Sequence, residues 1–335
     1  MSKKSAPPSK KPDPNPEACV FLLGPTACGK TTFLDRLARR LPIEVISCDS
    51  MQVYRGLACL TQAPNAAQMR RVPTHLVGHL GVHEEYDAAR FARSARLWIR
   101  RIVRRGKIPV VAGGTAFYAT ALLDGLFSGP AADETLRRRL ADQAGREGVA
   151  ALYGELAGLD PEAARVIHPN DLRRIIRALE VIHTAGRKFS DLKKERRGIW
   201  GAMPVRVHGL LWERKLLYER INLRAATMMN EGAVAEVRRV SARRVSKTAS
   251  ACLGLREIRD YLAGRQNLLR TTELIQMNTR RFAKRQMSWL KRDERIGWIR
   301  LAEEADIAHE ADRLAGDLRK WARASLPKPL PPNKR

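Results

Sequence analysis

The feature that most limits the possible folds of this chain is a glycine-rich segment close to its N-terminus. Residues 24–31 read G-P-T-A-C-G-K-T and fit the phosphate-binding pattern G-x-x-x-x-G-K-[ST]. A short apolar run, 18–23, ends directly before this segment, and a helical pattern, 30–40, follows it. A strand, a loop and a helix in this order predict an α/β fold with a phosphate site at the loop.

The residue types in the segment indicate how it binds phosphate. Backbone N–H groups of such a loop and the positive end of the following helix hold phosphate oxygens. The lysine adds a positive charge, and the hydroxyl of Thr31 is suited to Mg²⁺, the cofactor that we expect. The motif indicates phosphate groups without specifying ATP. The candidate diphosphate-binding residues are Gly24, Pro25, Thr26, Ala27, Cys28, Gly29, Lys30 and Thr31.

The rest of the chain predicts a parallel sheet that a helical segment interrupts. Apolar runs at 43–48, 108–112 and 205–211 alternate with helical patterns, whereas 133–190 lacks strand signals and has helix-start residues at Pro161 and Asp171 and a helix end at Gly186. Pro- and Lys-rich ends predict disorder. We expect a disordered basic tail (1–17), a core in two parts (18–125 and 201–323), a helical insertion (126–200) and a disordered tail (324–335).

The net charge of the chain indicates a polyanionic partner. There are 62 Lys and Arg residues against 35 Asp and Glu residues, and residues 171–300 alone carry a net charge of +18. In a helix over 274–295, residues Ile275, Phe282 and Trp289 are expected on a core face, opposite a basic face. A solvated basic face is an equal alternative for one helix, but the regional charge favours nucleic acid. The basic face consists of Arg280, Lys284, Lys291 and Arg295.

Cysteine spacing and hydropathy exclude other classes of protein. The five cysteines form no C-x-x-C pair and no Cys/His zinc pattern, so neither a disulfide framework nor a zinc module is expected. The longest apolar runs, such as 108–112, are far shorter than the ~20 residues that a bilayer-spanning helix needs. We expect a cytoplasmic protein, without a membrane partner, that acts as a monomer.

Asp49 directly follows the second apolar run, at the expected carboxyl end of the sheet. An acidic residue at this crevice can bind metal or act as a base. Alternatively, Asp49 and Ser50 can cap a turn, which would be a purely structural role.

Several blocks, in order, resemble the tRNA dimethylallyltransferase (tRNA isopentenyltransferase) family. Residues 49–56 read D-S-M-Q-V-Y-R-G, where the family has D-S-x-Q-V-Y-[KR]-G. Similar matches occur at 73–76 (P-T-H-L), 112–118 (A-G-G-T-A-F-Y), 168–180 (H-P-N-D-L-R-R-I-I-R-A-L-E), 217–221, 254–258 and 279–289. The resemblance covers about residues 18–300, and the chain is similar to the short bacterial type, which has no zinc finger.

The resemblance implies a P-loop NTPase-like core with a helical, tRNA-binding insertion, and it implies an activity. A dimethylallyl group would pass from dimethylallyl diphosphate to N6 of the adenosine beside the anticodon of tRNA, releasing diphosphate. An adenine amine is a weak nucleophile, so a carboxylate that accepts its proton is useful, and Asp49 is the candidate base. Arg224 is a candidate diphosphate ligand.

Thr115 and a set of tRNA contacts follow from the same resemblance. The Thr115 hydroxyl would reach the oxygen that bridges carbon and phosphorus, although an ordinary helix N-cap is the alternative. A surface or ion-paired role is an equal alternative for any single arginine among the tRNA contacts. The implied tRNA-binding residues are Asp49, Ser50, Met51, Gln52, Arg137, Arg173, Arg174, Ile175, Ile176, Arg177, Ala251, Cys252, Leu253, Gly254, Leu255 and Arg256.

The chain departs from the family pattern at three places. Cys28 stands where the family usually has Ser, and Thr74 replaces a His. Residues 60–64 read L-T-Q-A-P instead of G-T-[AN]-K-P, so the chain lacks a lysine that the family uses as a substrate contact.

Three other functions compete with tRNA prenylation. A P-loop small-molecule kinase fits the loop and the helical insertion, but neither it nor an AMP isopentenyltransferase explains the charge of 171–300. A non-catalytic RNA-binding protein leaves the phosphate-binding loop and Asp49 unexplained.

Overall fold

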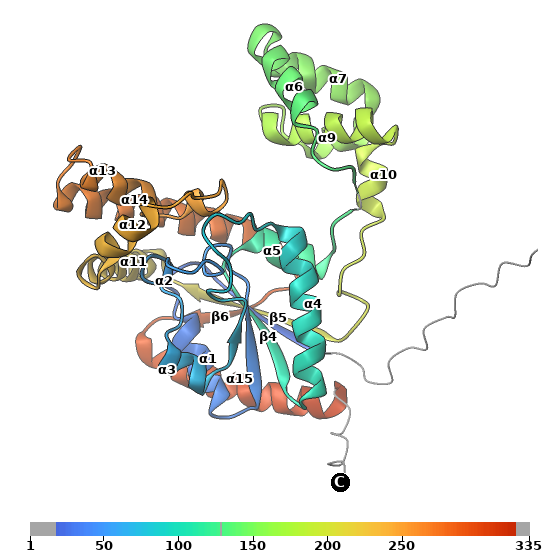
Figure 1. Ribbon diagram of the computed structural model, residues 1–335. Helices are drawn as coiled ribbons and strands as arrows, with labels where there is room; N and C mark the ends of the chain where they lie inside the picture. The colour runs from blue at the N-terminus through green and yellow to red at the C-terminus, as the bar shows by residue number, and fades with distance from the viewer. Residues whose placement is uncertain (1–17, 128, 326–335) are drawn as a thin grey trace, which may run out of the picture. The chain divides into compact units, whose positions relative to one another are not determined.

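The computed structural model describes residues 18–127 and 129–325, and these form two compact units (Figure 1). The first unit contains residues 18–122 and 200–325, and the second contains residues 123–127 and 129–199. The insertion was expected at 126–200. The tail expected at 1–17 lies outside the described residues, and so does the tail expected at 324–335 apart from 324 and 325, which end a helix.

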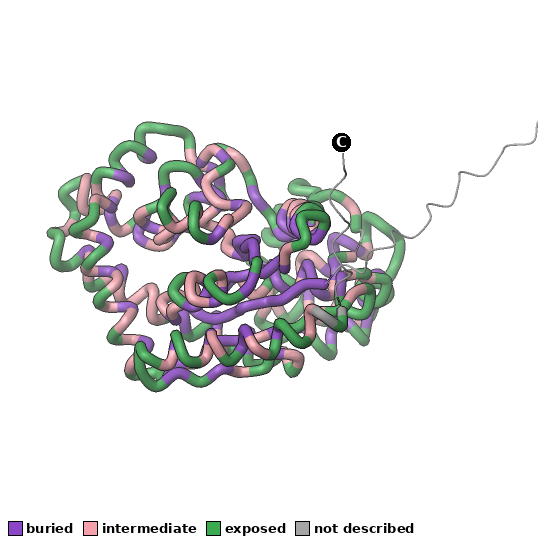
Figure 2. Tube along the Cα trace, turned by 90° about the horizontal axis from the view of Figure 1, so that it is seen from below, coloured by how far each residue is buried: buried purple, intermediate pink, exposed green. Residues whose placement is uncertain are grey.

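The first unit is built on a six-stranded parallel sheet, which confirms the predicted α/β class. The strand order is β3-β2-β4-β1-β5-β6. Every residue of β1, β2 and β4 is buried, as expected for parallel strands covered on both faces, and Figure 2 shows such strands as buried segments between partly exposed helices. The strands are β1 Cys19–Leu23, β2 Ile43–Ser47, β3 Thr74–His75, β4 Ile108–Gly113, β5 Val205–Trp212 and β6 Gly297–Leu301.

Helices cover both faces of the sheet. α1 and α15 pack side by side on one face, and α4 packs on β2 and β4 on the other (Figure 1). α11, α12, α13 and α14 form a connected helical group. The helices of this unit are α1 Lys30–Ala38, α2 Ala58–Thr61, α3 Ala66–Arg71, α4 Ala88–Arg104, α5 Ala116–Leu123, α11 Arg214–Asn230, α12 Ala233–Ser241, α13 Leu255–Leu262, α14 Leu268–Leu290 and α15 Glu304–Ser325.

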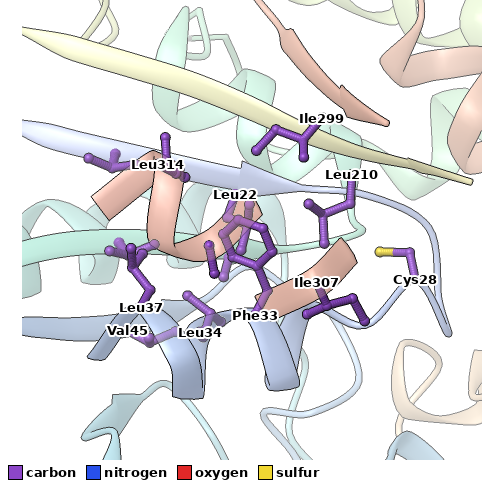
Figure 3. Close-up of a cluster of buried hydrophobic side chains, with 14 of the residues drawn as sticks. Leu22, Cys28, Phe33, Leu34, Leu37, Val45, Leu210, Ile299, Ile307 and Leu314 are labelled. Carbon is purple, nitrogen blue, oxygen red and sulfur yellow. The ribbon is translucent and has the colours of Figure 1, made fainter. Parts of the chain in front are cut away.

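The main core lies between α1, α15 and the sheet (Figure 3). Leu22 of β1, Phe33 of α1 and Leu314 of α15 belong to one buried cluster, which also includes Cys28 of the glycine-rich loop. Burying a side chain of the size of Leu or Phe contributes about 1.5–3 kcal/mol. The loop is therefore anchored in the main core of the unit through Cys28.

The second unit is a small helical bundle with its own core. Leu152, Leu156 and Ile175 are fully buried within it. The side chains of Asp160 and Asp171 cap α8 and α9, and α9 ends at Gly186 with a positive φ of 63°, as the sequence predicted. Its helices are α6 Glu134–Glu147, α7 Val149–Leu159, α8 Pro161–Val166, α9 Leu172–Ala185 and α10 Phe189–Lys194.

The face predicted for α14 was partly wrong. Ile275 is buried as expected, but Phe282 and Trp289 are only half-buried, and Ala283, Gln286 and Leu290 lie inside instead. The helix packs along α11 and α13 as well as reaching the loop, so its buried side is not one regular apolar stripe. The expected basic face is also divided, because α14 ends at Leu290, Arg280 bonds to Asn222 and Arg295 bonds to Asp293. Lys284 and Lys291 are exposed.

Among the described residues, no helix is long and apolar enough to cross a membrane.

Candidate functional site

The glycine-rich loop connects β1 to α1 at the carboxyl edge of the sheet. Gly29 has a φ of 85° and Ala27 a φ of 63°, both in the left-handed region. The ammonium group of Lys30 donates to the carbonyl oxygens of Gly24 (3.0 Å) and Pro25 (2.7 Å). The positive charge is therefore held against the loop, where a phosphate-binding loop needs it.

Two side chains from distant parts of the chain hold the outside of the loop. Trp212 Nε1 donates to the carbonyl oxygen of Cys28 at 3.0 Å, and Arg220 Nε donates to that of Ala27 at 2.8 Å. The carbonyl of one residue and the N–H of the next point in opposite directions across a trans peptide. These two bonds therefore turn the N–H groups of Cys28 and Gly29 toward the inner side of the loop, where an anion would bind.

Gln286 of α14 joins the loop to the turn after β4. Its Oε1 accepts the N–H of Thr26 at 3.0 Å, and its Nε2 donates to the carbonyl oxygen of Gly114 at 2.8 Å. The loop and the turn approach each other closely, since a Cβ on Gly114 would lie 2.9 Å from the Gly24 oxygen and 2.3 Å from Gln286 Nε2. Only glycine fits at position 114 without displacing the loop or the amide.

Asp49 and Thr115 lie beside each other at the same edge of the sheet. Asp49 Oδ1 accepts the N–H groups of Met51 (2.8 Å) and Gln52 (3.2 Å), and so caps the turn after β2. The Thr115 hydroxyl accepts the N–H of Ser50 at 3.1 Å. The Thr115 hydroxyl was expected either at a substrate oxygen or at a helix cap. In the structure it joins the turn after β4 to the turn that carries Asp49.

Arg224 of α11 and Gln52 approach the same backbone carbonyl. Arg224 Nη2 lies 3.3 Å from the oxygen of Thr61, and Gln52 Nε2 lies 3.4 Å from it. Burial lowers the pKa of the Arg224 guanidinium, and the negative charge of Asp49 opposes this shift. A guanidinium stays protonated in proteins, so Arg224 brings a positive charge close to Asp49.

Other predicted tRNA contacts of this unit begin at the short turn before α13. Ala251 and Arg256 are exposed and Leu253 is half-buried. Gly254, Cys252 and Leu255 are buried, so the side chains at 252 and 255 do not reach the surface. Any contact from these two positions is restricted to the backbone.

The predicted tRNA contacts of the second unit divide into paired, exposed and buried residues. Arg137 and Arg177 bind the fully buried carboxylate of Glu180, at 3.0 Å and 2.6 Å. Both arginines therefore have a structural partner within the unit. Arg173 is exposed, and Arg174 forms a surface pair with Asp171 at 3.2 Å; Ile175 is fully buried and Ile176 half-buried.

The residues present fit a diphosphate better than a metal bound by protein groups alone. No group of three His, Cys, Asp or Glu side chains that could hold a metal occurs in the described part of the chain. Thr31 lies exposed in the first turn of α1, beside the loop. A Mg²⁺ ion that keeps waters and binds phosphate oxygens needs few protein ligands, so a single hydroxyl is consistent with it.

Sequence reasoning did not identify Trp212, Arg220 or Gln286. Each contacts the loop from 184 or more residues away in the chain, and a single side chain that bonds to a distant segment leaves no local sequence pattern. Arg220 and Gln286 lie within blocks 217–221 and 279–289, which resemble the family, and this resemblance was the available signal.

Comparisons with known proteins identify the family to which the chain belongs. The family model described as IPP transferase matches residues 52–293. The chain is 41% identical to tRNA dimethylallyltransferase 2 of Syntrophus aciditrophicus, covering 88% of this chain and 95% of that protein. It is 38% identical to the tRNA dimethylallyltransferase of Bacillus subtilis, covering 86% and 92%.

Solved structures give the same result. The tRNA isopentenylpyrophosphate transferase of Bacillus halodurans matches with a TM-score of 0.66 and 35% identity, over 92% of this chain and 99% of that one. A eukaryotic dimethylallyltransferase, solved acting on tRNA, matches with a TM-score of 0.73 and 26% identity, over 91% and 80%. This chain, with its glycine-rich loop set beside Asp49 and Thr115 at the edge of a parallel sheet, belongs to the tRNA dimethylallyltransferase family.

Proposed function

We propose that this protein transfers a dimethylallyl group from dimethylallyl diphosphate to N6 of the adenosine beside the anticodon of tRNA, releasing diphosphate in the cytoplasm. Its relatives are named for dimethylallyl transfer to tRNA. The observation that carries the proposal is the meeting of the phosphate-binding loop with the Asp49–Thr115 edge, within one unit, through Gln286. A diphosphate and the acceptor adenine can thus be held on adjoining turns.

The loop side of the site is suited to the leaving group. Breaking the bond between the allylic carbon and oxygen leaves growing negative charge on diphosphate, and the inward N–H groups of Cys28 and Gly29, with Lys30, stabilise that charge. Besides Lys30, Arg224 adds a second positive side chain to the site, and it lies near Asp49. Mg²⁺, held at Thr31, would supply further neutralisation of the diphosphate. The Thr115 hydroxyl would donate to the bridging oxygen.

The Asp49 side of the site is suited to the nucleophile. The lone pair of an adenine amine is delocalised into the ring, so nitrogen attacks carbon more readily when its proton is taken as the bond forms. Asp49 uses Oδ1 to cap its own turn, and no described residue hydrogen-bonds to Oδ2. We propose that Oδ2 of Asp49 accepts the proton that the adenine amine loses.

The tRNA would bind through basic, exposed groups of both units. Arg173 and Arg256 are exposed and carry no ion pair within the described residues. Bases of a tRNA loop must leave their stack to enter an active site, and arginines commonly stack on or bind such loops. Arg137 and Arg177 would act by holding the insertion in shape around Glu180. The monomeric state stays a prediction.

Small-molecule phosphorylation and AMP prenylation are not favoured. Both use a phosphate-binding loop, but neither accounts for a net charge of +18 over residues 171–300. The relatives described above are named for tRNA, not for a free nucleotide.

One experiment separates these activities. The purified protein is incubated with radiolabelled dimethylallyl diphosphate and Mg²⁺, together with unmodified tRNA or AMP, with and without ATP. We expect label in tRNA without ATP and little label in AMP, because diphosphate is itself the leaving group. Equal or faster labelling of AMP, or a requirement for ATP, contradicts the proposal.

A further inference from the structure

We propose that Gln286 is a positioning residue that fixes the phosphate-binding loop relative to the turn that carries Thr115. The catalytic consequence rests on the function proposed above, whereas the mechanical coupling does not. Gln286 is one of few buried polar residues of the first unit, with 7% of its surface exposed. It touches neither the expected base nor the expected metal site, so it would act through the two segments that it joins.

Both polar atoms of this one amide are used. Thr26 supplies a backbone N–H, which can only donate, and Gly114 supplies a carbonyl oxygen, which can only accept. The orientation of the amide is therefore determined by its partners. Because an amide group is planar and rigid, the two backbone segments are held at a fixed separation.

The amide connects the two segments where the sheet no longer does. At the floor of the site, the N–H of Gly24 donates to the oxygen of Gly113 at 3.2 Å, continuing the pairing of β1 with β4. Beyond this bond β1 continues into the glycine-rich loop, and β4 continues through the turn into α5. Among the described residues, Gln286 alone bonds by its side chain to both the loop and the turn beyond that point.

The contacts continue from the turn to the candidate base. Thr115 follows Gly114 directly, and its hydroxyl accepts the N–H of Ser50, the neighbour of Asp49. Bonds thus run from the diphosphate side of the site to the proton-accepting side. A misplacement of about 1 Å between reacting groups can slow a reaction about 10²-fold.

Loss of Gln286 should affect the rate more than the affinity for diphosphate. Trp212 and Arg220 orient the loop's inward N–H groups independently of Gln286. The loop should therefore still bind diphosphate when the amide is lost, while the Thr115 turn shifts relative to it. A role in folding alone predicts a different pattern, in which rate and affinity change only as the folded fraction changes.

The first test compares Gln286→Met, which keeps the length of the side chain without its hydrogen bonds, with Thr271→Val. Thr271 is buried in the same helix, and its hydroxyl bonds only to Asn267 and Gln266 in the described structure. For Gln286→Met we expect about 10²-fold slower single-turnover transfer at saturating substrates and a Kd for Mg²⁺-diphosphate within about threefold of wild type. Thr271→Val should lower Tm and keep the transfer rate. A Gln286→Met rate within threefold of wild type, or equal rate losses in both variants at equal Tm, overturns the proposal.

The second test does not depend on transfer. Hydrogen exchange is measured with and without inorganic diphosphate and Mg²⁺. In the wild type we expect slower exchange over both 24–31 and 113–118, and in Gln286→Met slower exchange over 24–31 only. Protection confined to 24–31 in the wild type, or unchanged coupling in the variant, refutes the positioning role. A wild type that shows coupling but labels no tRNA would refute the proposed function and leave the coupling supported.

Discussion

Replacing Asp49 by Asn tests whether this carboxylate is a base or only a cap. Asn keeps an oxygen that can accept the N–H groups of Met51 and Gln52, which Asp49 Oδ1 accepts at 2.8 and 3.2 Å. Two charge-assisted bonds become neutral ones, so the expected loss of stability is only about 1 kcal/mol. The lost basicity should slow transfer by ~10²–10⁴-fold, equivalent to about 2.7–5.4 kcal/mol in the barrier.

The assay is single-turnover transfer from radiolabelled dimethylallyl diphosphate with enzyme in excess over tRNA, with Tm measured in parallel. Asp49→Ala is the matched control, because it removes both the base and the cap. A base predicts equally slow Asn and Ala variants, with Ala also less stable. If Asp49 only caps the turn, Asn retains the wild-type rate and Ala does not. If raised Mg²⁺ restores the Asn variant, the residue is a metal ligand, and the base assignment is refuted.

Further predictions concern stability, metal and RNA. Burial alone would raise the pKa of Glu180, but bonds from Arg177, the Asp133 N–H and Arg137 lower it. A carboxyl group whose pKa is lower in the folded chain stabilises the fold at pH values above its unfolded pKa, ordinarily 4.5. This stabilisation is lost as the pH falls through the pKa of the folded state. Glu180→Gln should therefore cost about 3 kcal/mol at neutral pH and progressively less below pH 4.5 in urea unfolding; a pH-independent difference contradicts this account. Thr31→Val should raise the Mg²⁺ concentration needed for half-maximal transfer and leave tRNA affinity unchanged in filter binding; an unchanged Mg²⁺ requirement removes Thr31 from the metal site. If about four Lys or Arg side chains contact phosphate, tRNA affinity should fall roughly 10²-fold between about 50 and 200 mM salt, and a flat response would argue against a basic tRNA surface.

Local sequence patterns predicted the centre of the sheet well. The loop at 24–31 and the strands β1, β2 and β4 were recognisable because each is a continuous buried run or a fixed motif. β3 has only Thr74 and His75, and in β6 only Ile299 and Leu301 are buried, so these strands are too short or too mixed in polarity to give such a signal.

Sequence motifs pointed to the residues of the candidate site, but not to the side chains that hold those residues in place. The motifs singled out Asp49 and Thr115, and the structure places them at one edge; their catalytic roles stay predictions. Gln286 was expected on no particular face of its helix, because a buried amide is indistinguishable from a surface one until its partners are known. The pairing of Arg137 and Arg177 with Glu180 was likewise invisible, since charge alone does not distinguish an RNA contact from an internal ion pair.

In the proposed reaction the acceptor is the adenosine beside the anticodon, and diphosphate leaves as the prenyl group arrives. The most direct measurement is the ratio of diphosphate released to label incorporated, for a tRNA transcript and for the same transcript with guanosine in place of that adenosine. We expect one diphosphate for each label incorporated into the first transcript, and neither product with the second. Labelling of the guanosine transcript, or diphosphate release without incorporation, would contradict it.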